Sequence, residues 1–193
     1  MNRAQAIQHV NASLQEGIEL RKMVARDCGT GIVEAAFLIS KSLQSGGKVL
    51  FFGNGGSAAD AQHLAAEFVG RFVRERRGLP AIALTTDSSI LTAVGNDYGF
   101  DQIFARQIQA LIRPGDVAVG ISTSGNSPNV LEGVRAATKA NGKTIGLSGK
   151  DGGALAKEVD LAITIASSNT ARIQECHIAI GHLLCELIDE GVG

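Results

Sequence analysis

The sequence predicts an α/β fold in which an open parallel sheet of about five strands is flanked by helices. Three observations predict this class. From Lys48 onward, short apolar runs alternate with longer helical stretches. The runs are almost continuously apolar, as expected of parallel strands that are covered on both faces. The chain of 193 residues shows no repeat, low-complexity tract or linker, so a single domain over residues 1–193 is expected.

Two helices are predicted before the first strand, within residues 1–46. In each, apolar side chains recur at spacings of three and four: Ile7, Val10, Leu14 and Ile18 in the first, and Ile32, Ala36, Ile39 and Leu43 in the second. Gly46-Gly47 permits the left-handed backbone that ends such a helix. We expect this N-terminal helical hairpin to contact another subunit, because oligomers commonly bury such stripes; packing against its own domain is the alternative.

Five strands are predicted in the alternating part of the chain: Val49–Phe52, Ala81–Thr85, Val117–Ser122, Thr144–Leu147 and Leu161–Ile165. The helices predicted between and after them are Ala58–Phe68, Asp101–Ile112, Asn129–Ala140, Gly153–Glu158 and Arg172–Asp189. Ligands of open α/β sheets bind outside the carboxyl ends of the strands. The segments that directly follow these strands are therefore expected to form the binding site.

Composition excludes several classes of function. The net charge of −1 and the isoelectric point near 6.4 argue against a general affinity for nucleic acid or for an anionic membrane. Trp is absent and aromatic residues make up 4% of the chain, which excludes a platform for stacking bases. We expect neither a membrane span nor a secretory signal, because no apolar run is long enough. The odd cysteine count indicates reduced thiols and a cytoplasmic location: Cys28, Cys176 and Cys185.

A glycine-rich segment, Gly53-Asn54-Gly55-Gly56-Ser57, follows the first predicted strand and precedes a helix. Glycines allow positive φ and a close approach of a ligand to the backbone. The start of a helix offers unpaired N–H groups and the positive end of a dipole. The segment matches neither the dinucleotide fingerprint nor the nucleotide-triphosphate loop. It predicts contact with a phosphate or a sugar; a tight turn with Ser57 as the N-cap is the alternative.

A hydroxyl-rich segment, residues 122–128, follows the third predicted strand. Four hydroxyl side chains crowd this turn, whereas a helix cap needs only one. Hydroxyls and helix-terminal N–H groups can hold a phosphate monoester without a lysine, and Pro128 suits the first turn of a helix. The segment predicts a phosphate site built from Ser122, Thr123, Ser124 and Ser127.

Asn96-Asp97 is a further polar pair, which we expect to reach the same crevice and to bond sugar hydroxyls. A turn around Gly95 and Gly99 is the alternative for this stretch.

Two pairs of residues carry candidate acid-base or metal chemistry. His63 and Glu67 are four residues apart and so share one face of a helix; they suit zinc ligation or acid-base catalysis, with a surface ion pair as the alternative. Gln174 and His182 lie about 80° apart around their helix axis, so both can reach one cleft. Spacing alone leaves His177 as a competitor of His182, and a buried core histidine is the alternative for either.

Five stretches, taken together and in this order, resemble the sugar isomerase (SIS) domain family, and within it the bacterial phosphoheptose isomerases. They are GNGGSAADAQHLAAEF, LPAIALTTDSSILTAVGNDYGF, GISTSGNSPNV, SGKDGG and ARIQE-x-H-x4-H. The resemblance runs along nearly the whole chain. It implies a flavodoxin-like SIS fold, a homotetramer with sites at subunit interfaces, and one zinc ion per subunit. Ala171 stands where some members carry an acidic residue, so no carboxylate is expected there.

By motif position, the resemblance also implies site residues. The implied metal ligands are His63, Glu67, Gln174 and His182, which selects His182 over His177. The implied substrate contacts are Asn54, Gly55, Gly56, Glu67, Asn96, Asp97, Ser122, Thr123, Ser124, Ser127 and Gln174. Arg71 is a further candidate, with a surface role as the alternative. As catalytic residues we predict Glu67, the base that moves a proton between two carbons, and His182, its partner acid.

The activity that the resemblance implies converts the ketose sedoheptulose 7-phosphate into the aldose D-glycero-D-manno-heptose 7-phosphate, the first step of ADP- and GDP-heptose biosynthesis. An isomerase of another sugar phosphate and a regulatory sugar-phosphate sensor are alternatives. A role without catalysis is a third, because a related bacterial protein of the same fold binds the replication initiator. In that relative, the positions that match Glu67 and His182 are not the acid-base pair.

Overall fold

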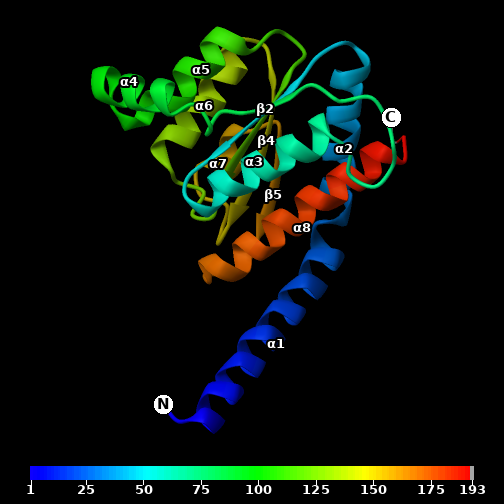
Figure 1. The fold of residues 1–193 in the computed structure, drawn as a ribbon, viewed down its shortest axis with the longest axis vertical. Coiled ribbons are helices and arrows are strands. Elements are labelled where there is room, and N and C mark those ends of the chain that lie inside the picture. The colour runs from blue at the N-terminus through cyan, green and yellow to red at the C-terminus, as the bar shows by residue number, and fades with distance from the viewer. Residues whose placement is uncertain (192–193) are drawn as a thin grey trace.

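The computed structural model describes residues 1–191 of the chain. It contains one sheet of five parallel strands in the order β2-β1-β3-β4-β5 (Figure 1). This is the strand order of flavodoxin-like folds, and it confirms the predicted fold class. The strands are β1 (Val49–Gly53), β2 (Ala81–Ala83), β3 (Val117–Ser122), β4 (Lys143–Gly149) and β5 (Leu161–Ile165).

The centre of the sheet is its most buried part. Every residue of β1 and of β3 is buried, and their register pairs Gly53 with Ile121. The edge strand β2 is shorter than predicted, because the chain turns away after the Leu84 N–H donates to the Phe51 carbonyl at 2.9 Å. The carboxyl ends of β1 and β3 therefore lie side by side where the strand order reverses, which is the place where open α/β sheets bind ligands.

Helices cover both faces of the sheet, and alternate strand residues supply the two cores. Phe51 contacts Phe68 on one face, with ring centroids 5.5 Å apart. Its neighbour Phe52 contacts Phe104 on the other, at 5.4 Å. The helices of the first face are α2 (Gly29–Gln44), α3 (Gly56–Val69) and α8 (Thr170–Asp189); those of the second are α5 (Ile103–Leu111), α6 (Pro128–Lys139) and α7 (Leu155–Glu158), with the short 3-10 helix η1 (Phe100–Gln102) before α5.

A helix that the sequence did not predict, α4 (Ser88–Tyr98), follows β2. The Asp87 carboxylate caps it by accepting from the Ile90 N–H at 2.9 Å. None of its residues is fully buried, and its core contacts are limited to the partly buried Leu91 and Val94. The turn considered around Gly95 and Gly99 is wrong at Gly95, which lies inside the helix. The helix ends at Tyr98, and Gly99, with φ 88°, is its C-cap residue.

The two N-terminal helices exist as predicted, but they do not form a hairpin. α1 (Arg3–Asp27) runs into α2 with only Cys28 between them, and Cys28 has right-handed helical angles (Figure 1). Its N–H bonds the Val24 carbonyl and its carbonyl accepts from the Ile32 N–H, each at 2.9 Å. The hairpin is wrong because helical hydrogen bonding continues through the junction, so the chain never reverses.

The exposed surface of α1 differs from that of α2. α1 extends away from the sheet (Figure 1), and its four predicted apolar residues are each about half exposed: Ile7, Val10, Leu14 and Ile18. The stripe of α2 instead packs into the core through Ile32, Ala36 and Ile39. A subunit contact through α1 stays a prediction. Within residues 1–191, no helix combines the length and the apolar character needed to cross a membrane.

The three cysteines are free and buried, and burial raises the pKa of all three thiols, that of Cys185 to about 12. Because the thiolate is the reactive form, we expect iodoacetamide at pH 8 to leave the native protein unmodified. After unfolding in guanidinium chloride, mass spectrometry should count three adducts. Rapid alkylation of one thiol in the native protein would contradict this burial.

Candidate active site

The glycine-rich segment forms the turn from β1 into α3. Gly55 is the N-cap residue, with φ 55°, and the helix begins at Gly56. Ser57 is buried in the first turn, so its considered role as the N-cap is wrong. A Cβ atom at Gly56 would overlap the side-chain amide of Gln174 from α8. Glycine at this position therefore lets the C-terminal helix approach the backbone of the loop closely.

The hydroxyl-rich segment brings together three of its four predicted hydroxyls, those of Ser122, Ser124 and Ser127. Ser122, the last residue of β3, has its Oγ 2.9 Å from the Ser127 Oγ and 3.3 Å from the Ser124 Oγ. Ser127 precedes α6 but makes no side-chain cap bond to that helix, since its hydroxyl is turned toward Ser122. Gly125 reverses the chain between them, with φ 67°. Three hydroxyls thus lie together directly before the N-terminus of a helix, where phosphate groups commonly bind.

A reciprocal amide pair joins the two loops. The Asn54 Nδ2 donates to the Asn129 Oδ1, and the Asn129 Nδ2 donates to the Asn54 Oδ1, both at 2.8 Å. Asn129 is 2% exposed, so this pair is well shielded from water. The glycine-rich loop after β1 and the hydroxyl-rich loop after β3 are therefore fixed relative to one another.

The predicted carboxylate and imidazole converge on a third residue, His63. The His63 Nε2 lies 2.8 Å from the His182 Nε2 and 3.4 Å from the Glu67 Oε1. The first contact joins α3 to α8, and the second spans one turn of α3. The ring of Phe72 stacks on the His182 ring, with centroids 5.4 Å apart. Residues from two distant parts of the sequence thus form one cluster.

His177 and His182, which spacing could not separate, have different environments. His177 is 1% exposed and its Nε2 lies 3.0 Å from the Ser148 carbonyl. Burial lowers the pKa of His177, which favours a neutral ring. His177 is therefore the core histidine of α8, while His182 faces the cluster on α3.

Asp60 is a buried acid that the sequence did not single out. It is 8% exposed and its Oδ2 has no hydrogen-bond partner among the described residues. Burial raises the pKa of this carboxyl to about 6, while His63 and a hydrogen bond from Gln174 favour the charged form. Asp60 and Gln174 line a cavity of about 250 Å³ together with Ala171, Glu175 and Ile178.

Two predicted substrate residues lie on the unpredicted helix α4. Asn96 and Asp97 are exposed, and the Asn96 Nδ2 donates to the Asp97 Oδ1 at 2.8 Å. A cavity of about 160 Å³ between α4 and the glycine-rich loop is lined by Asn54, Gly55 and Leu91, among others. The predicted contact of Asn96 and Asp97 with a sugar stays a prediction.

The side chains of His63, Glu67 and His182 have the chemistry of zinc ligands, namely two imidazoles and a carboxylate. Within residues 1–191, no three His, Cys, Asp or Glu side chains are arranged to hold a metal ion. The His63 and His182 Nε2 atoms face each other at a hydrogen-bond distance, and Gln174 lies against Gly56 and Asp60. The donor types fit zinc, and a zinc site remains a prediction.

Comparison with known proteins agrees with this architecture. The sequence model of the SIS domain matches residues 14–149. The phosphoheptose isomerase of Aquifex aeolicus (strain VF5) is 53% identical over 186 residues, which are 96% of this chain and 97% of that protein. That of Geobacter sulfurreducens is 55% identical over 184 residues, 95% of this chain and 97% of its own length. The chain belongs to the phosphoheptose isomerase family of SIS-domain proteins.

Solved structures of this family have the same fold over the same length. The phosphoheptose isomerase of Neisseria gonorrhoeae superposes with a TM-score of 0.92 at 47% identity, covering 96% of this chain and 99% of that one. The protein from Francisella tularensis gives 0.93 at 41% identity, covering 96% and 98%. Membership therefore extends from the N-terminal helices to α8.

Proposed function

We propose that the chain interconverts sedoheptulose 7-phosphate and D-glycero-D-manno-heptose 7-phosphate as a ketose-aldose isomerase. The observation that carries this proposal is the convergence of Glu67 and His182 on His63. The membership of this chain in the phosphoheptose isomerase family supports the same reaction and substrate. The role without catalysis has no such support, because both members of the acid-base pair are present.

The isomerisation moves one proton from C1 to C2 through an enediol while the two oxygens exchange protons. A carboxylate suits the carbon-to-carbon transfer, and an imidazole suits proton exchange with oxygen at neutral pH. We assign the first role to Glu67 and the second to His182. His63 lies between them, and its Nε2, which makes both contacts, donates or accepts a proton according to the tautomer of the ring.

The phosphate of the substrate would lie at the hydroxyl-rich loop. Ser122, Ser124 and Ser127 offer clustered hydroxyls beside the N-terminus of α6, and the Asn54–Asn129 pair holds the loop next to the start of α3. The glycine-rich loop leads directly into α3, the helix that carries Glu67. A phosphate bound at one end would orient the carbon chain toward the acid-base cluster.

We also propose that one zinc ion per subunit belongs to the site. His63, Glu67 and His182 would hold it, with Gln174 as the predicted fourth ligand. A His182 that ligates zinc would not act as a free acid, and the metal would then supply the polarisation of the oxygen. A bound zinc ion acts as a Lewis acid that polarises a carbonyl oxygen.

The assembly that we propose is a homotetramer with sites at subunit interfaces. His63 has a side chain that is 47% exposed within one chain, whereas a closed site favours the proposed proton transfers. The exposed stripe of α1 and an apolar cleft between α1, α2 and α8 offer surface for other subunits; the cleft is lined by Val24, Ile32, Ala179 and Leu183, among others. We place the enzyme in the cytoplasm, where its buried thiols would stay reduced.

The function is tested by incubating the purified chain with sedoheptulose 7-phosphate and following the sugar by NMR. We expect the aldose phosphate to appear, and prior chelation to lower the rate at least about tenfold because carbonyl polarisation is lost. Added zinc should restore the rate.

Two outcomes separate the parts of this proposal. The absence of any aldose product, with zinc supplied and the protein folded, would overturn the isomerase assignment. Equal rates before and after chelation, with metal removal verified by mass spectrometry, would overturn the zinc assignment alone.

A further inference from the structure

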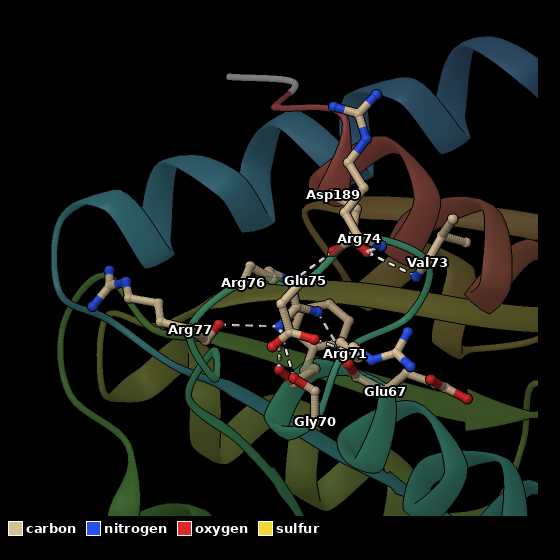
Figure 2. Close-up of polar contacts among 10 residues, drawn as sticks. Glu67, Gly70, Arg71, Val73, Arg74, Glu75, Arg76, Arg77 and Asp189 are labelled. Carbon is tan, nitrogen blue, oxygen red and sulfur yellow. Dashed lines mark hydrogen bonds and ion pairs between the residues drawn. The ribbon is translucent and has the colours of Figure 1, made fainter.

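The segment between α3 and β2 contains an ion pair that is shielded from water. Arg76 and Asp189, the last residue of α8, pair at 2.6 Å between Nε and Oδ1. Their side chains are 17% and 2% exposed. Figure 2 shows this pair at the centre of a set of polar contacts that includes the backbone of Glu67. Neither residue belongs to the site described above.

The Arg76 guanidinium caps the C-terminal end of α3. Its Nη2 donates to the Glu67 carbonyl at 3.0 Å (Figure 2), and its Nη1 donates to the Phe68 carbonyl at 2.8 Å. α3 ends at Val69, so these carbonyls belong to the last turn, which has no later helical N–H to accept from. The negative end of the helix dipole also attracts a cation at this position. The backbone of the proposed base is therefore held by Arg76.

The Asp189 carboxylate fixes the other side of the cluster. Its Oδ2 accepts from the Val73 N–H at 3.1 Å and the Arg74 N–H at 3.2 Å. The residue before Val73 is Phe72, whose ring stacks on His182. Asp189 follows His182 by nearly two helical turns and so lies on the same face of α8. The carboxylate therefore ties the segment that supports the His182 ring to the helix that carries it.

We propose that Arg76 and Asp189 are positioning residues, which together set the separation of Glu67 from His182. This inference rests on the proposed function. One guanidinium reaches the carboxylate and the carbonyls of α3 at once because its donors form a rigid planar fork. A lysine has a single ammonium group and cannot hold all of these acceptors in the same geometry. The pair joins the ends of the two helices from which the acid-base residues project.

A neighbouring ion pair supplies a matched control. Arg74, two residues earlier, pairs with Glu190, the residue after Asp189, with both Nη2 contacts at 2.6 Å. This pair also links the segment to the end of α8, but its side chains are 57% and 53% exposed. The Arg74 guanidinium bonds the Glu190 carboxylate, whereas the contacts to the α3 carbonyls come from Arg76. Loss of Arg74 therefore removes an ion pair of the same type without removing the proposed positioning.

The experiment compares Arg76→Lys, Arg76→Ala, Asp189→Asn and Arg74→Ala with the unaltered chain, all with zinc supplied. We expect kcat to fall about 10- to 100-fold in Arg76→Lys, further in Arg76→Ala, and about 10- to 100-fold in Asp189→Asn. KM should stay within about threefold, because the hydroxyl-rich loop is untouched, and Arg74→Ala should stay within about twofold of the unaltered kcat.

The pH dependence of kcat separates positioning from a loss of folded protein. A smaller folded fraction that circular dichroism shows to be the same at each pH lowers kcat equally at every pH, whereas displacement of Glu67 from His63 changes the apparent pKa values of the profile. We expect a shifted profile in Arg76→Lys and Asp189→Asn, measured below the unfolding temperature that circular dichroism gives for each variant. A kcat within twofold of the unaltered enzyme, or a lowered kcat with an unchanged profile, would overturn the pair as a positioning device. An unaltered chain without isomerase activity would instead overturn the proposed function, and this inference with it.

Discussion

Replacement of Glu67 by Gln, or of His182 by Gln, is expected to lower kcat by about 10²- to 10⁴-fold, the usual cost of losing a general acid or base. At position 67, glutamine keeps the size of glutamate but cannot accept the proton from carbon. At position 182, glutamine has no group that exchanges a proton near neutral pH, as an imidazole does. Both positions face the cluster around His63 rather than the core, so the variants should stay folded. The rate is measured by NMR with sedoheptulose 7-phosphate, and folding by circular dichroism.

Two substitutions on α1 provide controls of the same chemistry. His9→Gln and Glu19→Gln change exposed residues of that helix and should leave kcat within about twofold, as is usual for surface sites. Because Glu67 and His182 have different assigned roles, the loss of either one alone should lower the rate. Near-normal turnover in either variant would show that the assigned residue does not transfer the proton.

The strands were predictable because each element of the sheet has a local signature. β1 and β3 are buried on both faces, and strands of this kind have nearly unbroken apolar runs in the sequence. α4 was missed because none of its residues is fully buried and only Leu91 and Val94 pack against a core. The prediction of a hairpin at Cys28 is wrong because the sequence pattern of two helices with a short interruption is the same whether the chain reverses or only bends.

The site was predictable where it depends on spacing along one helix. His63 and Glu67 are one turn apart and meet as expected. The choice of His182 over His177 came from the resemblance, because both lie on a helix that is buried against the sheet on one side. Arg76 and Asp189 escaped prediction because their partners include backbone groups and because they are far apart in sequence. No residue-type pattern records a side chain that caps a distant carbonyl.

The second large effect is expected at the hydroxyl-rich loop. The double variant Ser124→Ala/Ser127→Ala should raise KM about 100-fold or more, because each hydrogen bond to a charged group contributes about 1.5–3 kcal/mol and 1.4 kcal/mol corresponds to tenfold in affinity. kcat at saturating substrate should change far less than in Glu67→Gln, since the acid-base cluster is untouched. Initial rates over a range of sedoheptulose 7-phosphate concentrations measure both constants.

The phosphate is located by comparing KM and kcat of the serine double variant with those of the Glu67 and His182 variants. If the hydroxyls only stabilised the turn, their loss would lower the unfolding temperature and leave KM unchanged in the protein that remains folded. Ser45→Ala, an exposed serine at the C-terminal end of α2, controls for the removal of a hydroxyl at the opposite edge of the sheet and should alter neither constant. An unchanged KM in the double variant would place the phosphate elsewhere, while a raised KM with a retained kcat fits a loop that holds the substrate and a separate cluster that moves its protons.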